Sequence, residues 1–237
     1  KKGQAWHTLR EILNRHKQHP DTEWALNGHE LSPFEQLYIQ LQPEDVQVRN
    51  VWLFNEDDHT QMIDPATAIR RKTAVVELLR ELGLERVLEL RLEVKYPWYL
   101  GEALAKVIKD EKDLQSVWLC LEDDAPHIAF AHGFISQKLK CEGAPWMQTL
   151  VKELLEKGYS DKAVANVLVV ARLGQELWQY IETLGEGVHQ EYWLRMDPIF
   201  NDLTNEEVIE GINKLLQHRR FSFAVREAWL HGSDLPS

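Results

Sequence analysis

The sequence predicts an all-α protein of about a dozen helices arranged in antiparallel hairpins. Three observations support this fold class. Apolar residues recur at the helical spacing of i, i+3, i+4 and i+7 through most of the chain, and residues that cap helices stand at the ends of those segments. Only one short stretch alternates between apolar and polar residues, as a strand would. The composition, with 44% hydrophobic and 27% charged residues, is that of an ordinary globular protein.

Several segments carry an apolar stripe that fits one face of an α-helix. In chain order they span residues 34–41, 75–82, 100–108, 114–121, 146–155 and 208–216. Another segment, 163–173, is apolar on nearly all sides. A helix of that composition is covered by neighbours on more than one side, so we expect 163–173 in the inner layer of a stacked array.

Capping residues predict where several helices begin and end. Capping boxes stand at 32–35 and at 204–207. Asp64 stands directly before Pro65, and Asp124 stands two residues before Pro126. Each places an acid ahead of a helix start, where the N-terminal dipole favours it. Helix ends are predicted at three glycines that follow the last apolar residue of a segment: Gly83, Gly158 and Gly185.

The exception to the helical pattern is LELRLEVKY at 88–96, which alternates strictly between apolar and polar residues. Such alternation is typical of a half-buried strand. No second clear strand exists to pair with it, and an unpaired strand leaves its backbone N–H and C=O groups unsatisfied. We therefore interpret 88–96 as helix.

Internal similarity indicates repetition. VWLFNEDD at 51–58 and VWLCLEDD at 117–124 agree at six of eight positions, and the helix pairs of 160–185 and 204–232 each carry a late Trp. These similarities predict an α-solenoid-like array of degenerate HEAT- or TPR-like hairpins, in which each hairpin buries its apolar stripe against its neighbours. We expect residues 1–237 to form a single domain of this kind.

Three segments carry a resemblance to a known group of proteins: VRNVWLF at 48–54, KYPWYLGEALAKV at 95–107 and GVHQEYWLRMDP at 187–198. The chain resembles a helical-repeat region of large multidomain bacterial proteins of unsettled function, some of them associated with toxin–antitoxin or phage-defence architectures. The shared residues are Trp, Pro, Gly and Leu, which serve packing, so the resemblance implies a fold and no catalytic residues. Because the chain starts at Lys1 without Met, we also expect a piece of a longer protein.

Charge and cysteine content narrow the choice of partners and compartment. The formal net charge is −11, and a field of that sign repels phosphate backbones and anionic lipid, which argues against nucleic acid and membranes as partners. No apolar run reaches the ~18 residues that a membrane span needs. Cys120 and Cys141 have no CxxC spacing and predict two buried free thiols, which suits a reducing cytoplasm.

One polar cluster has the residue types of a metal site: Glu122, Asp123, Asp124, His127 and His132. The two histidines are five residues apart, whereas metal-binding helices of the HExxH type place them at i and i+4. We interpret the acids as residues that cap a helix start, and 55–59 as a solvated acidic loop. No metal or other cofactor is predicted.

An alternative hypothesis of enzymatic function rests on Glu93 and Lys95 in the alternating segment. If that segment were a strand, both side chains would point the same way. With Asp64 upstream, they would resemble the core of restriction-endonuclease-like nucleases, where two carboxylates hold Mg²⁺ and a lysine assists attack of water on phosphate. The motif is short, the required mixed sheet is missing and the net charge is unsuited to DNA.

Aromatic and basic residues are the candidates for binding a partner. They are Trp24, Trp98 and Trp193 near turns, and Arg219, Arg220 and Arg226 in the basic C-terminal segment. In that segment Phe221, Phe223 and Trp229 interleave with the basic residues, a combination that binds acidic peptides or single-stranded nucleic acid. For this segment we prefer the structural interpretation, in which the aromatic rings pack inward and the helix dipole places the basic residues.

The sequence carries no phosphate-binding glycine loop, no GxSxG elbow and no motif around either cysteine. We therefore predict a non-catalytic module that binds a protein or peptide, which can be another domain of the same chain. It would act as a scaffold, sensor or regulatory region of a larger cytoplasmic bacterial protein.

Overall fold

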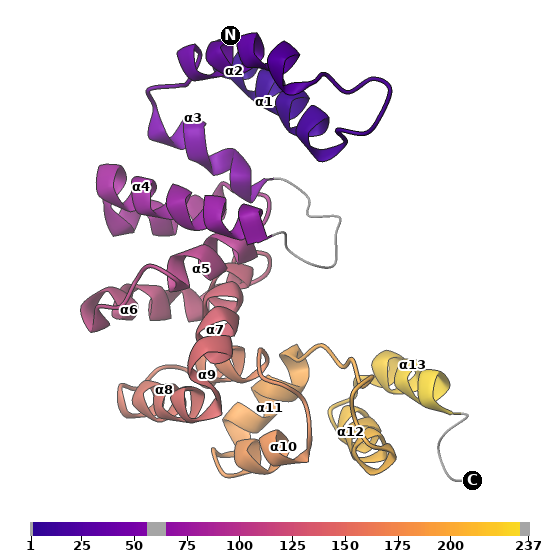
Figure 1. The fold of residues 1–237 in the computed structure, drawn as a ribbon. Helices are drawn as coiled ribbons and strands as arrows, with labels where there is room; N and C mark the ends of the chain where they lie inside the picture. Colours follow the sequence, from indigo (N-terminus) through magenta and orange to yellow (C-terminus); the bar gives the residue numbers. More distant parts are fainter. Residues whose placement is uncertain (1, 56–64, 233–237) are drawn as a thin grey trace. The chain divides into compact units, whose positions relative to one another are not determined.

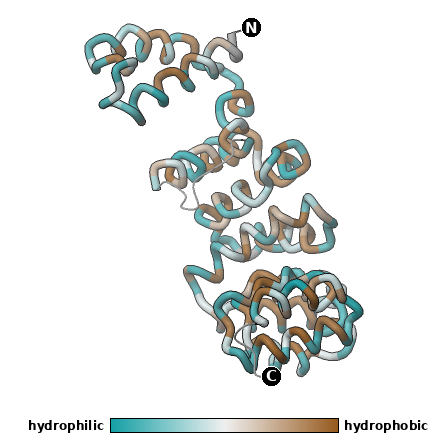
Figure 2. Tube along the Cα trace, turned by 90° about the vertical axis from the view of Figure 1, so that its right-hand side faces the viewer, coloured by the Kyte–Doolittle hydropathy of each residue, from teal (hydrophilic) through white to brown (hydrophobic). Residues whose placement is uncertain are grey.

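The computed structural model describes residues 2–55 and 65–232, and every regular element in these residues is a helix (Figure 1). The predicted all-α class is therefore confirmed. Hydrophobic and hydrophilic residues alternate along the individual helices, as burial of one helix face requires (Figure 2). The chain divides into two compact units, Lys1–Lys95 and Tyr96–Ser237. That 1–237 forms one domain stays a prediction.

The first unit is built on a hairpin of two helices. Its elements are α1 (Lys2–Gln18), α2 (Gly28–Gln40), α3 (Val46–Asn50), the 3₁₀ turn η1 (Val51–Phe54), α4 (Pro65–Glu89) and the 3₁₀ turn η2 (Leu90–Leu92). Leu9 and Leu13 of α1 pack with Leu31 of α2 in a buried cluster. The Trp6 ring stacks on Tyr38 with 5.0 Å between centroids, which adds an aromatic contact to the same hairpin.

The capping box predicted at 32–35 is wrong, because α2 begins at Gly28. Asn27 is the N-cap residue, and its Oδ1 accepts a hydrogen bond from the Glu30 N–H at 3.1 Å. Glu30 Oε2 in turn accepts from the Asn27 N–H at 2.9 Å, which completes a capping box of its own. The earlier start adds a turn that carries Leu31 into the core, and that burial outweighs a proline inside the helix.

The interpretation of 88–96 as helix is correct as far as Leu92. α4 ends at Glu89, η2 follows, and the chain then turns without forming a strand. Gly83 lies at φ +79° and ψ 168°, which is not helical, so α4 consists of two helical stretches and the first ends at this glycine, as predicted. Asp64, the predicted cap of α4, lies outside the described residues.

The second unit contains the remaining helices. They are α5 (Pro97–Ala105), α6 (Glu111–Trp118), the 3₁₀ turn η3 (Leu119–Glu122), α7 (Ile128–Glu142), α8 (Ala144–Glu156), α9 (Asp161–Leu168), α10 (Gln175–Glu182), α11 (Glu186–Arg195), α12 (Asn205–Gln217) and α13 (Phe221–His231). α9 lies at the centre, where it contacts α7, α8, η3 and α11. Residues 163–168 are each at most 2% exposed, so the predicted burial is confirmed for this part of 163–173. It is wrong for 169–173, because α9 ends at Leu168 and the chain that follows is half-buried or, at Arg172, exposed.

α5 and α7 lie closer together than they could with larger residues at the contact, because a glycine of each helix faces the backbone of the other helix. A Cβ on Gly101 would lie 1.9 Å from the carbonyl oxygen of Phe130, and one on Gly133 would lie 2.1 Å from the carbonyl oxygen of Trp98. The Phe134 ring beside this contact packs edge-on against Trp118. The glycine contact therefore holds α5 against α7, and Trp118 at the end of α6 packs on the same helix.

Glu122 and Asp124 bind the start of α9, although the sequence placed the acids of 122–124 before α7. The Ser160 hydroxyl, at the N-cap of α9, donates to Glu122, and Lys162 pairs with Asp124 at 2.7 Å. α7 begins later, at Ile128.

The second predicted capping box is confirmed, because Thr204 Oγ1 accepts from the Glu207 N–H.

The cysteines are both free, as predicted, but only Cys120 is buried. Cys141 is exposed in the last turn of α7, so its predicted burial is wrong. Among the described helices, none has both the length and the apolar character required to cross a membrane.

Replacing Gly101 by alanine is expected to lower the free energy of unfolding by about 3 kcal/mol, because rigid backbone occupies the space of the new Cβ. Urea unfolding followed by circular dichroism measures this loss. Gly28 has no heavy atom within 4 Å of its Cβ position, so Gly28→Ala is the control and should be neutral. An unchanged midpoint for Gly101→Ala would show that the two helices do not pack this closely.

His132 makes the second unit sensitive to acid. Burial lowers the pKa of its imidazole from 6.5 to about 4, and Nε2 has no hydrogen-bond partner. The unfolded chain therefore binds the proton more strongly, so stability is full above pH 6.5 and falls as the pH approaches 4, by about 3 kcal/mol in total. The difference between the unfolding free energies at pH 7 and pH 5 should become smaller in His132→Leu, whereas a His127→Gln control should keep the wild-type difference.

Candidate functional site

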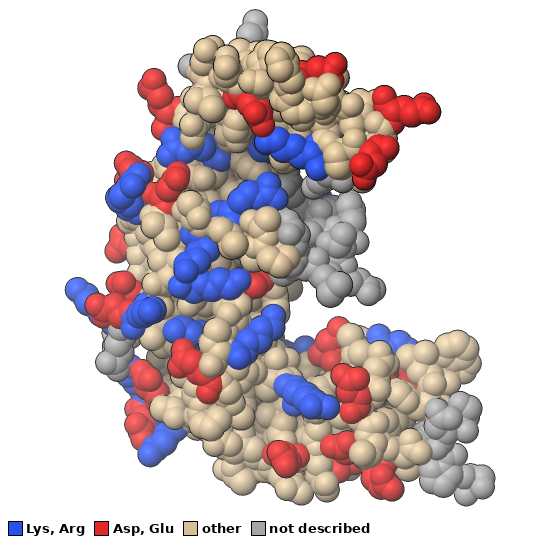
Figure 3. Space-filling view, viewed as in Figure 1, with Lys and Arg blue, Asp and Glu red and all other residues tan. Residues whose placement is uncertain are grey.

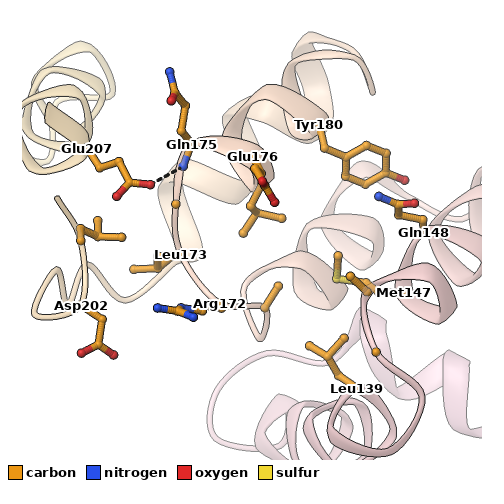
Figure 4. A pocket seen from close by; sticks show the side chains of 16 residues that line it. Leu139, Met147, Gln148, Arg172, Leu173, Gln175, Glu176, Tyr180, Asp202 and Glu207 are labelled. Atoms are coloured by element: carbon orange, nitrogen blue, oxygen red, sulfur yellow. Dashed lines mark hydrogen bonds between the residues drawn. The ribbon is translucent and has the colours of Figure 1, made fainter.

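The second unit contains a cleft of about 630 Å³ among the ends of several helices. Its walls come from α7, α8 and α10, from the connection before α10, and from the loop and first turn of α12 (Figure 4). The side chains labelled in the figure are Leu139, Met147, Gln148, Arg172, Leu173, Gln175, Glu176, Tyr180, Asp202 and Glu207. The cleft is therefore assembled from segments that are far apart in the sequence.

Apolar side chains form one part of the cleft lining. Met147 and Leu177 are 4% and 8% exposed, and Leu139, Leu173 and Leu203 are half-buried beside them. Burial raises the pKa of the Tyr180 hydroxyl, so this group stays a neutral hydrogen-bond donor at neutral pH. The combination of an apolar lining with a few polar groups is typical of ligand-binding clefts.

Three exposed charged residues border this lining. The side chains of Arg172, Glu176 and Asp202 have no hydrogen bond or ion pair with any residue that the structure describes, and the charge of Arg172 acts at longer range on Glu207. Their charges are therefore available to a bound group. On the face seen in Figure 3, basic and acidic side chains are likewise interspersed.

Glu207 has a structural role in the wall of the cleft. Its carboxylate accepts from the Gln175 N–H at 3.0 Å, and from the Thr204 N–H at 2.9 Å, so one side chain caps both α10 and α12. These backbone donors lower the pKa of Glu207. Gly174 permits the approach, because it lies at φ +151° and a Cβ there would be 3.1 Å from Glu207 Oε1.

The hairpin of α12 and α13 is held to α10 and α11 by aromatic and charged contacts. Arg220 donates to the carbonyl oxygens of Trp193 and Met196 at 3.0 and 2.6 Å, next to the end of α11. The His218 ring stacks on Trp193, and a Cβ on Gly211 would lie 2.7 Å from the Phe200 ring. This docking places Asp202 and Glu207 at the cleft, so the site depends on it.

The structure changes the roles of three predicted partner-binding residues. Trp193 is 0% exposed, so the accessible position expected from the sequence is wrong, because α10 and α12 cover it. The guanidinium group of Arg220 donates to backbone carbonyl oxygens. That of Arg226 donates to the Pro198 oxygen and pairs with Glu227. Both guanidinium groups also lie over the Phe223 ring. Arg226 nevertheless keeps 43% of its side chain exposed.

The other predicted residues stay nearer the surface. Trp24 is 49% exposed and packs beside His16 and His19 in the first unit. Trp98 is half-buried in the first turn of α5, and Arg219 is exposed at φ +57°. None of these residues lines the cleft. Sequence reasoning missed Arg172 and Asp202, because a single charge in a connection carries no periodic signal.

The residues of the nuclease hypothesis do not form the geometry it required. Glu93 and Lys95 lie in a turn after η2, and Glu93 accepts from Arg86 at 2.6 Å. Asp64 lies outside the described residues, as do 56–59 of the second acidic segment. Among the described residues, no group of three or more His, Cys, Asp or Glu could hold a metal ion.

Comparisons with protein-family models, with curated proteins and with solved structures each gave no match for this chain. The resemblance to a helical-repeat region of bacterial proteins therefore stays a prediction, and function has to be argued from the site itself.

Glu207→Ala is expected to lower the free energy of unfolding by about 1–2 kcal/mol, since two helix starts lose their cap. Hydrogen exchange at the Gln175 amide should accelerate. The contribution of Glu207 is present at neutral pH and is lost as its carboxylate is protonated in acid, because its pKa is lowered in the folded state. Glu206→Ala, at an exposed neighbour, is the control; equal exchange at Gln175 in both variants would contradict this role.

Proposed function

We propose that this chain is a non-catalytic helical module that binds a peptide segment of a protein partner in the cleft of its second unit. The observation that carries the proposal is the cleft of about 630 Å³, with buried apolar residues in its lining and unpaired charges at its border. Sites that bind compact ligands have volumes of roughly 300–1,000 Å³ and a similar mixture of groups.

The charges in the cleft suggest what the peptide presents. Arg172 offers a guanidinium group that binds a carboxylate through paired hydrogen bonds. Glu176 and Asp202 offer acceptors for a basic side chain or for backbone N–H groups. Met147 and Leu177 take part in the apolar lining against which an apolar side chain packs. A peptide with one apolar side chain between charges of opposite sign fits this pattern.

The arrangement of the helices in the second unit supports the other part of the proposal, which is that the chain is a helical-repeat array with a binding role. Short connections join successive helices of the second unit, so we propose a degenerate helical-repeat array that presents the ends of its helices to a partner. In this proposal the module belongs to a larger cytoplasmic bacterial protein, and the peptide comes from another protein or from another domain of the same chain.

Selection of random-sequence peptides on the purified chain tests the proposal. We expect enriched peptides that bind with dissociation constants near the micromolar range. Arg172→Glu should weaken them at least about tenfold, because it places a third carboxylate beside Glu176 and Asp202. Fluorescence anisotropy with labelled peptides measures the change.

Lys152→Glu is the matched control for this experiment. Lys152 is an exposed cation of α8 outside the cleft, and its reversal changes the net charge by the same amount. Peptides that bind wild type and both variants equally would show that the cleft is not the binding site. If the selection enriches no peptide, the proposed function is wrong.

A further inference from the structure

The docking of the α12–α13 hairpin brings two histidine rings together. His189 of α11 and His218 at the C-terminal end of α12 have ring centroids 5.0 Å apart. Trp193 of α11 lies beside both rings: His218 stacks on it with 6.0 Å between centroids, and His189 meets it edge-on with 6.4 Å between centroids. α11 and α12 therefore meet through three rings, and two of these rings can take up a proton.

The surroundings of His189 favour a neutral ring. Both of its ring nitrogens are buried, and neither has a hydrogen-bond partner in the part of the chain that the structure describes. A protonated imidazole donates from both nitrogens, so protonation here would create a buried positive charge without acceptors. If His218 were protonated as well, two like charges would face each other with 5.0 Å between ring centroids. The docked interface therefore disfavours protonation of the histidine pair, by which we mean His189 and His218.

Charged groups around the histidine pair have opposing effects, and burial decides the balance. Burial lowers the pKa of both imidazoles from the ordinary value of 6.5, and Lys214 of α12 lowers both further. Glu186 of α11 raises both pKa values, and Glu182 of α10 raises that of His189. Glu182 also pairs with Lys214, which offsets part of its effect. Both pKa values therefore stay below 6.5 in the docked state.

The charged groups of the other neighbouring helices have partners of their own. α9 also packs on α11, but its Asp161 lies against Gly187, where a Cβ would be 1.9 Å from Asp161 Oδ2. Gly187 is two residues from His189 and therefore on roughly the opposite side of the helix. Lys162 of α9 pairs with Asp124. The charged and titratable groups of α13 lie together: Arg226, Glu227 and His231.

The docked position of the hairpin relies mainly on α12, the helix that ends at the histidine pair. Phe221 and Trp229 of α13 are 57% and 80% exposed, which corrects the interpretation from the sequence that these rings pack inward. They contribute little burial to docking as a result. Val208 and Leu215 of α12 are both 0% exposed. A change of charge beside His218 therefore acts on the helix that holds the hairpin in place.

We propose that the histidine pair is an acid-sensitive switch, and that protonation of both rings in mild acid releases the α12–α13 hairpin from α10 and α11. In the released hairpin the rings regain the ordinary pKa near 6.5, whereas docking lowers it. Docking is therefore strongest above pH 6.5 and weakens as the pH falls below that value. Release would also withdraw Glu207 of α12 from the wall of the cleft, a consequence that rests on the proposed function.

Hydrogen exchange of the whole chain, measured by mass spectrometry at about pH 7.5 and about pH 5.5, tests the switch. After correction for intrinsic exchange rates, the α12 amides should exchange at least about threefold faster at the lower pH. The α9 amides should stay slower than those of α12 at both pH values, because the hairpin opens while the centre of the unit stays folded. Glu182 and Glu207 remain ionised in this range, since their pKa values are lowered from 4.5.

Two kinds of variant assign the effect to the histidine pair. Replacing His189 by leucine and His218 by phenylalanine together should abolish the acceleration, because neither new side chain takes up a proton and phenylalanine keeps a ring on Trp193. Glu186→Gln leaves both histidines in place and removes an acid that favours their protonation. Its acceleration at the lower pH should therefore be larger than in wild type.

Glu206→Gln is the matched control, because it removes the same charge at an exposed position of α12 and should behave as wild type. Equal α12 exchange at both pH values in wild type would overturn the proposal. So would an acceleration that persists in the double histidine variant, or equal behaviour of Glu186→Gln and Glu206→Gln. No peptide is present in this experiment, so its outcome is separate from that of the peptide selection.

Discussion

The second unit depends on the close contact of α5 and α7, where Gly101 and Gly133 face carbonyl oxygens of the opposite helix. No larger residue fits at either position, so the contact sets the separation of the two backbones. α7 then leads through Gly143, at φ +78°, directly into α8. Since the end of α7 and the start of α8 line the cleft, the buried contact between α5 and α7 helps to position a surface site.

Charged side chains also hold together the part of this unit that contains α10 to α13. Glu207 caps two helices, and Arg220 binds carbonyl oxygens near the end of α11. Glu227 is buried against donors from two segments. Such contacts require particular partners and directions, whereas apolar packing does not, so they specify how the α12–α13 hairpin docks.

The cleft combines an apolar lining with charges of both signs. A module with such a site would hold a peptide segment of its partner in one orientation, because the charges discriminate between the two ends of the segment. This is the behaviour expected of a scaffold or regulatory region, which is the proposed role.

Local sequence determined which segments are helical, the capping box at Thr204 and the burial of 163–168, because helical periodicity and capping act between residues close in the chain. Tertiary structure decided what covers each side chain. Trp193 and Trp229 have similar sequence surroundings, yet one is 0% and the other 80% exposed. Likewise, the cleft is lined by residues of α7 to α12, and no regular spacing in the sequence relates these residues to one another. Exposure is a property of neighbours distant in sequence, so only the folded chain fixes it.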